Sequence, residues 1–124
     1  MTEKTILVVD DDPGIVTLMA TMLRREGFAT LAAYTGEEAL SQYERQRPAL
    51  ILLDLAMPGM SGFEVAQEIR RREQGKARTP IVVLTAHAQS YYASRQDELD
   101  ADGYITKPLT MEKLRSELRQ LIPA

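Results

Sequence analysis

The chain has 124 residues, a length that fits one domain and leaves no room for two. Hydrophobic residues make up 44% of it and charged residues 27%, a balance typical of globular proteins rather than disordered ones. Lys and Arg number 15 against 18 Asp and Glu, so the net charge is −3 and predicts no direct binding to nucleic acid or to an anionic membrane. The absence of cysteine and the single histidine, His87, exclude thiolate zinc sites, thiol nucleophiles and multi-histidine metal sites.

No apolar stretch in the sequence approaches the roughly 20 residues of a transmembrane helix. The first residues, Met1 to Lys4, lack the pattern of a signal peptide. We therefore expect a cytoplasmic protein.

Short apolar runs alternate with longer amphipathic stretches in the first half of the chain. The first run, residues 5–9, is apolar on both faces, which predicts a strand of a parallel sheet covered on each side. Apolar residues at helical spacing begin at Ile15 and continue to a stop signal at Gly27. A weaker strand over 29–33 follows, and the capping box that starts at Thr35 predicts a helix running to about residue 46.

The second half repeats this alternation. Three more apolar runs predict strands over 49–53, 80–84 and 103–105. Three more helices are predicted: one opened by a capping box at Ser61, one of low amphipathicity over 88–99, and one capped by Thr110 that ends near Leu121. The five strand–helix units predict a doubly wound α/β fold with a five-stranded parallel sheet and five helices.

Charged and hydroxyl side chains follow four of the five predicted strands. Asp10, Asp11 and Asp12 follow the first, Asp54 the third, Thr85 the fourth, and Thr106 and Lys107 the fifth. Ligand sites of parallel α/β sheets lie at the carboxyl ends of the strands, so these groups are expected to converge. Two carboxylates ~4 Å apart repel by about 4 kcal/mol at an effective dielectric of ~20, and a hard divalent cation such as Mg²⁺ would relieve that repulsion.

An ordered set of short motifs occupies these strand ends. They are ILVVDDD at 6–12, LLD at 52–54 with Met57-Pro58 and Gly62, LTA at 84–86, and Lys107-Pro108. Together they resemble the CheY-like receiver domain of two-component response regulators, over about residues 6–121. The resemblance implies a single receiver domain over 1–124 with the flavodoxin-like strand order 2-1-3-4-5.

The resemblance implies a phosphoacceptor and a metal site. Asp54 would accept a phosphoryl group from a phosphohistidine, forming an aspartyl phosphate. Asp11 would bind Mg²⁺, or Mn²⁺ in its place, directly, and Asp10 would hold metal-bound water. Asp54 itself and the backbone carbonyl of Ala56 would complete the protein ligands.

The resemblance also implies phosphoryl-binding and switch residues. Lys107 would pair with a phosphoryl oxygen, and the Thr85 hydroxyl would hydrogen-bond to the phosphoryl group. Tyr104 would move inward as Thr85 shifts toward the phosphate. Ala56 and His87 hold the two positions that tune the phosphoryl lifetime in this family, and the Lys107–Pro108 peptide would be cis.

The implied partners are a sensor histidine kinase or histidine phosphotransfer protein and an output protein or effector domain that the sequence does not identify. Phosphorylation would switch a surface formed by the fourth helix, the fifth strand and the fifth helix. The chain would not be a conventional enzyme beyond its own Mg²⁺-dependent phosphorylation and dephosphorylation. Its start and end predict a stand-alone receiver or the N-terminal part of a longer regulator.

Several other interpretations remain open from the residues themselves. The spacing of Asp10 and Asp12 also fits a haloacid-dehalogenase-like phosphatase with Asp10 as nucleophile, although Pro13 departs from that pattern. A flavin-binding domain is disfavoured because three aspartates would repel a phosphate. A degenerate receiver that binds without phosphorylation is disfavoured because every matched position is present. We expect Asp12 to act mainly as a helix N-cap.

A basic run follows the helix that Ser61 opens. It comprises Arg70, Arg71, Arg72, Lys76 and Arg78. We expect a solvated helix end, where cations also interact favourably with the helix dipole.

Overall fold

Five parallel strands form one sheet in the order β2-β1-β3-β4-β5, as predicted. The computed structural model describes residues 4–74, 77–85 and 101–122. The strands are β1 (Thr5–Val9), β2 (Ala29–Ala33), β3 (Leu50–Asp54), β4 (Ile81–Thr85) and β5 (Gly103–Thr106). The helices of the described residues are α1 (Pro13–Arg25), α2 (Gly36–Gln46), α3 (Gly62–Arg72) and α5 (Met111–Leu121). The helix predicted over 88–99 lies outside the described residues.

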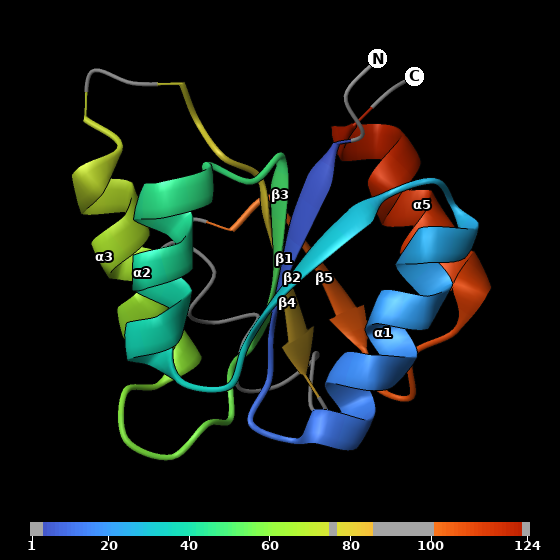
Figure 1. Ribbon diagram of the computed structural model, residues 1–124, viewed down its shortest axis with the longest axis horizontal. Coiled ribbons are helices and arrows are strands. Elements are labelled where there is room, and N and C mark those ends of the chain that lie inside the picture. The colour runs from blue at the N-terminus through green and yellow to red at the C-terminus, as the bar shows by residue number, and fades with distance from the viewer. Residues whose placement is uncertain (1–3, 75–76, 86–100, 123–124) are drawn as a thin grey trace.

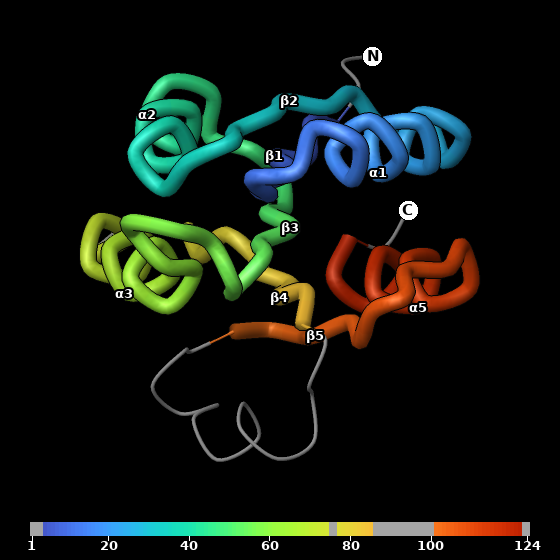
Figure 2. Tube along the Cα trace, turned by 90° about the horizontal axis from the view of Figure 1, so that it is seen from below, coloured from blue at the N-terminus to red at the C-terminus, as the bar shows by residue number. Residues whose placement is uncertain are grey.

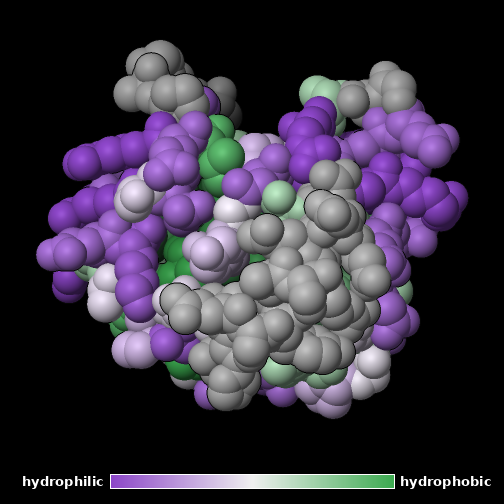
Figure 3. Space-filling view, turned by 180° about the vertical axis from the view of Figure 1, so that it is seen from behind, coloured by the Kyte–Doolittle hydropathy of each residue, from purple (hydrophilic) through white to green (hydrophobic). Residues whose placement is uncertain are grey.

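The helices lie in two layers, α1 and α5 on one face of the sheet and α2 and α3 on the other (Figures 1 and 2). Alternate residues of β1 enter opposite cores: Leu7 packs on the side of α2 and α3, whereas Ile6 and Val8 pack on the side of α1 and α5. Both faces of the sheet are therefore buried, which explains why the strands are apolar throughout. The outer helical surfaces at both sides of the molecule are mainly hydrophilic (Figure 3).

The predicted helix caps are present, but the capping box expected at Thr35 is incomplete, because Oε1 of Glu38 accepts the amide of Tyr34 rather than that of Thr35. The side chain of Asp12 accepts a hydrogen bond from the Gly14 amide, and Thr110 caps α5 in the same way. Ser61 and Glu64 form the reciprocal capping box of α3. No helix of the described ranges is long and apolar enough to cross a membrane.

Three strands, β3, β4 and β5, end one residue further along the chain than predicted. Asp54 pairs with Leu84 across β3 and β4, and Thr85 pairs with Thr106 across β4 and β5. The ladder continues because each neighbouring strand still offers backbone partners at that position. Asp54 and Thr85 are therefore the last residues of their strands, where the sheet fixes their backbones.

The basic run is only partly solvated, so the prediction is wrong for Arg70. Its side chain is 12% exposed, and its guanidinium group contacts Glu73, the Thr79 carbonyl (2.8 Å) and the Asp102 carboxylate (2.8 Å). Asp102 also accepts a hydrogen bond from Arg78. We refer to these five residues as the Arg70 network; it forms because α3 ends beside the amino ends of β4 and β5. Arg71, with 67% of its side chain exposed, is solvated as expected, and Lys76 lies outside the described residues.

Candidate functional site

The carboxyl ends of β1, β3 and β5 bring together two buried aspartates and one lysine. Asp10 follows β1, Asp54 ends β3, and Lys107 follows β5. The Lys107 ammonium nitrogen lies 3.6 Å from Oδ1 of Asp54 and 3.8 Å from Oδ2 of Asp10. Asp54 is only 3% exposed and Asp10 only 1%, whereas the side chain of Lys107 is 34% exposed. One cation thus lies between two buried anions.

Asp10 is the least satisfied charged group of the site. Its Oδ1 accepts a hydrogen bond from the Asp12 amide at 2.9 Å, but its buried Oδ2 has no hydrogen-bond partner. Burial is the main cause that raises the pKa of this carboxyl group, and the nearby Asp54 carboxylate raises it further. A buried oxygen of this kind calls for a cation or a proton.

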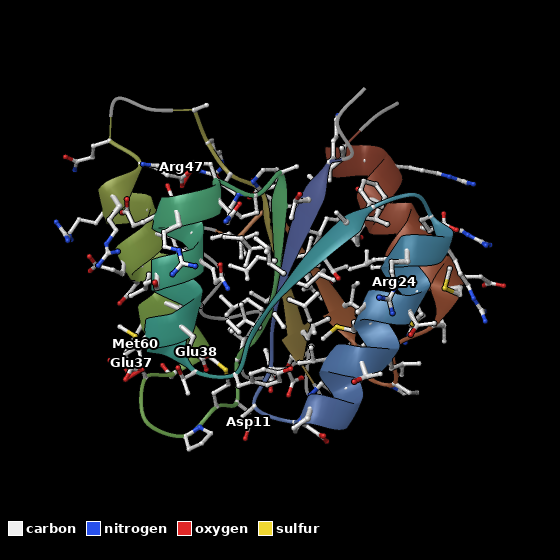
Figure 4. All side chains as sticks on the ribbon, in the orientation of Figure 1. Asp11, Arg24, Glu37, Glu38, Arg47 and Met60 are labelled. Carbon is white, nitrogen blue, oxygen red and sulfur yellow. The ribbon has the colours of Figure 1, made fainter. Side chains whose placement is uncertain are left out.

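Three carboxylates offer a ligand set for a metal ion. One oxygen each from Asp10, Asp11 and Asp54 lie within 4.8 Å of one another. Asp11 is exposed and lies at the lower edge of the molecule in Figure 4, so water can reach the site from that side. Three carboxylates and one ammonium group leave two formal negative charges, which match a divalent cation. Together with the unpartnered Oδ2 of Asp10, this oxygen-only set fits Mg²⁺.

Backbone hydrogen bonds hold the remaining predicted residues near this pocket. The Ala56 amide donates to Oδ1 of Asp54 at 3.1 Å. The Lys107 amide donates to the carbonyl of Thr85 at 2.8 Å, and the side chain of Thr85 is buried. The Lys107–Pro108 peptide is cis, as expected. These contacts tie the ends of β3, β4 and β5 to one site.

Tyr104 stands apart from the groups above. Tyr104 pairs with Val83 in the sheet, and its side chain is 49% exposed. His87 lies outside the described residues.

One positioning residue was not predicted. The Lys113 ammonium group donates to the carbonyls of Thr106 (2.9 Å) and Pro108 (3.1 Å), on either side of Lys107. Lys113 lies in the first turn of α5. Nothing in the sequence distinguishes it from an ordinary surface lysine. Lys113 therefore supports the segment that carries Lys107.

The fold and the pocket define a class: a doubly wound α/β domain with a carboxylate cluster and a lysine at the carboxyl ends of its strands. The family model of the response regulator receiver domain matches residues 6–119. The chain belongs to this family, and so to the domains of two-component signal transduction.

Known relatives support this membership. The chain is 39% identical over 119 residues to the alkaline phosphatase synthesis transcriptional regulatory protein PhoP of Bacillus subtilis, covering 96% of the chain and 48% of that protein. It thus spans about half the length of the curated relatives it matches.

Solved structures agree in fold. The chemotaxis protein CheY4 of Vibrio cholerae is 30% identical, with a TM-score of 0.89 over 98% of this chain and 100% of that one. The receiver domain of the sensor histidine kinase PA1611 of Pseudomonas aeruginosa is 32% identical, with a TM-score of 0.88 over 99% of this chain and 100% of that one. The PA1611 domain holds a magnesium ion in its active-site cleft.

Proposed function

We propose that the chain is a phosphoacceptor receiver domain, over residues 1–124, that takes a phosphoryl group from a histidine kinase or histidine phosphotransfer protein onto Asp54. A carboxylate oxygen of Asp54 forms the bond to phosphorus as the phosphorus–nitrogen bond of the phosphohistidine breaks. The electron pair of that bond stays on the imidazole nitrogen, which leaves. The observation that carries the proposal is the Lys107 ammonium group 3.6 Å from Asp54, beside the unpartnered carboxylate oxygen of Asp10.

Each nearby side chain has a role in this transfer. Lys107 pairs with a phosphoryl oxygen once Asp54 carries the phosphoryl group. The Ala56 amide, which donates to Oδ1 of Asp54, orients the carboxylate. The Thr85 hydroxyl, at the end of the neighbouring strand, donates a hydrogen bond to the phosphoryl group. Asp54 is already held by the sheet, so it loses little freedom when it reacts.

The metal site is proposed to consist of Asp10, Asp11, Asp54 and the carbonyl of Ala56. Bound there, Mg²⁺ or Mn²⁺ would supply positive charge to the phosphoryl oxygens. The magnesium ion in the PA1611 cleft supports this assignment. Asp11 faces solvent and leaves room for water ligands, which Mg²⁺ retains in most protein sites.

The output is proposed to be a change of surface. Phosphorylation adds about 1.5 to 2 negative charges at Asp54 and draws the Thr85 hydroxyl inward. Tyr104, now 49% exposed, follows into the space that Thr85 vacates, which changes the surface formed by β5, α5 and the predicted fourth helix. Ala56 and His87 are proposed to set how long the phosphoryl group persists. The output protein or effector domain that reads this surface is a partner yet to be identified.

The phosphatase interpretation loses its support. It needs Asp12 as an acid beside Asp10, but Oδ1 of Asp12 accepts the Gly14 amide at 2.9 Å as the N-cap of α1. The family membership supports a receiver domain rather than a phosphatase.

Incubation with Mg²⁺ and acetyl phosphate tests the proposed function. Mass spectrometry of the wild-type chain should locate one phosphoryl group on Asp54, and Asp54→Asn should remain unlabelled. Lys107→Ala should still accept phosphate, but the ring of Tyr104 should then stay exposed, as read from its NMR signals. Labelling of Asp10, or unchanged labelling of Asp54→Asn, would overturn the assignment.

A further inference from the structure

We propose that Gly36 is a positioning residue for the metal site. Met60 packs directly against Gly36, and this contact fixes the loop between β3 and α3. We call residues 55–61 the β3–α3 loop; it carries Ala56. The inference rests on the proposed function, because Ala56 is a proposed metal ligand. It adds a residue of α2, outside the pocket, to the groups that determine metal affinity.

The contact between Gly36 and Met60 leaves no room for a side chain. A β-carbon built on Gly36 would lie 2.7 Å from Cβ of Met60 and 2.8 Å from its Cγ and Sδ. Met60 lies beside Glu37 at the first turn of α2 (Figure 4). Rotation of the Met60 side chain cannot relieve the contact with its own Cβ, which moves only with the loop backbone. A methyl group at position 36 would therefore displace the loop.

The backbone at Gly36 does not itself require glycine. Gly36 is the first residue of α2 and its φ is not positive, in contrast to Gly27 (φ 90°) and Gly59 (φ 72°). Alanine is the better helix former, so helix stability alone would favour Ala at this position. The space taken by Met60 is the physical reason for glycine here.

The loop is short and held at both ends, so a displacement of Met60 reaches Ala56. The Gly62 amide donates to the carbonyl of Leu55 at 3.3 Å and closes the loop. Met57 is buried in the core on the side of α2 and α3. The turn at Gly59 directs Met60 back onto α2. The segment from Ala56 to Met60 thus lies between two fixed points and has little slack to absorb a shift.

A double-mutant cycle on the whole chain tests the coupling. Mg²⁺ alone is titrated into wild type, Gly36→Ala, Met60→Gly and the double variant, and the dissociation constant is read from the backbone amide shift of Ala56. Gly36→Ala should weaken Mg²⁺ binding about tenfold, the lower end of the effect of changing a group that supports a metal ligand. In the Met60→Gly background the same substitution should change binding by less than about twofold, because the obstacle is gone.

The Met60→Gly result and one control variant keep the test decisive. Met60→Gly alone should bind Mg²⁺ at least about threefold more weakly than wild type, because the loop loses its contact with Gly36. Ser41→Ala, an exposed change on the same helix, should bind as wild type. Thermal unfolding without metal separates lost affinity from lost folding.

The outcomes separate the inference from the proposed function. Wild-type affinity in Gly36→Ala or in Met60→Gly overturns the inference, as does an equal loss from Gly36→Ala in both backgrounds. If Gly36→Ala does not fold, the Met60→Gly result decides alone. If wild type itself binds no Mg²⁺, the proposed function fails, and the inference with it.

Discussion

Replacing Asp102 with alanine should destabilise the domain more than the loss of a surface ion pair would. Oδ2 of Asp102 accepts hydrogen bonds from the Arg70 guanidinium (2.8 Å) and the Ile81 amide (2.9 Å), and Oδ1 accepts one from Arg78 (2.9 Å). The carboxylate is 19% exposed and the Arg70 side chain 12%. Asp102 therefore holds the end of α3 against the amino ends of β4 and β5.

The magnitude follows from what Asp102→Ala leaves behind. Breaking a buried ion pair by removing one partner costs about 3–5 kcal/mol, and a buried amide without a partner costs about 1–3 kcal/mol. These costs overlap, and Arg70 retains Glu73 and the Thr79 carbonyl, so we expect a loss of about 3 kcal/mol. That is a large part of the ~5–15 kcal/mol that stabilises a domain, and it should lower the Tm by about 10 °C.

Urea unfolding of wild type, Asp102→Ala and Asp102→Asn measures this loss. Asparagine keeps an acceptor but not the charge, so its midpoint should fall between the other two. Glu68→Gln is the matched control, because Glu68 also contacts two arginines, Arg71 and Arg72, on the surface. The fall in its midpoint should be much smaller than that of Asp102→Ala, because solvent screens an ion pair at the surface. A loss in Asp102→Ala no larger than that in Glu68→Gln would refute the reasoning.

Three more outcomes follow from the charges and the packing. Asp10→Asn should raise the Tm of the metal-free chain, measured by thermal unfolding in chelator, because it removes a buried carboxylate whose pKa burial raises; a lower Tm would contradict this. Hydrogen bonds from Arg71 and Arg72 lower the pKa of Glu68 to about 2. Carbon-13 NMR should find this pKa for Glu68 at low salt and a higher pKa in strong salt, which screens the two arginines. The stability that the ionised Glu68 contributes is present above the ordinary pKa of 4.5 and is lost as the pH falls toward 2. Gly62→Ala should cost about 2 kcal/mol or more in urea unfolding, since its β-carbon would lie 2.4 Å from the Asp54 carbonyl oxygen; wild-type stability would show that the two backbones can separate freely.

The fold could be predicted because several sequence signals agree. Residues 5–9 and 50–54 are apolar at nearly every position, which suits only strands buried on both faces. Ser61 and Glu64 mark the start of α3 by a reciprocal pair of hydrogen bonds that depends on neighbours three residues apart. Such local signals do not require knowledge of the tertiary structure.

The candidate site could be predicted in outline because parallel strands end at one edge of the sheet. That rule places Asp54 and Lys107 together although 53 positions separate them in the numbering. It does not distinguish Asp10 from Asp11. The Asp10 amide donates to the Ala33 carbonyl at 3.1 Å and so continues the pairing of β1 with β2 as far as Asp10, which is buried, whereas the next residue, Asp11, is exposed.

The Arg70 network could not be predicted because its partners are far apart in sequence. Arg70 and Asp102 are 32 residues apart, and Arg78 and Asp102 are 24 apart. Three consecutive arginines at a helix end look alike in sequence, and only the packing of α3 against the sheet buries the first of them. The contact between Met60 and Gly36 is hidden for the same reason.

The two ends of β5 differ in what they contribute to stability, and this difference favours switching. At the amino end, Asp102 satisfies three donors, and its own amide donates to the Ile81 carbonyl at 2.8 Å. At the carboxyl end, Asp10 keeps an unpartnered buried oxygen near Lys107. The proposed phosphorylation of Asp54 would add charge at the less satisfied end, where a change in local interactions of a few kcal/mol can shift the conformational balance. Because Asp102 holds the other end, we expect that shift to act on the strand end and its side chains rather than to separate the sheet.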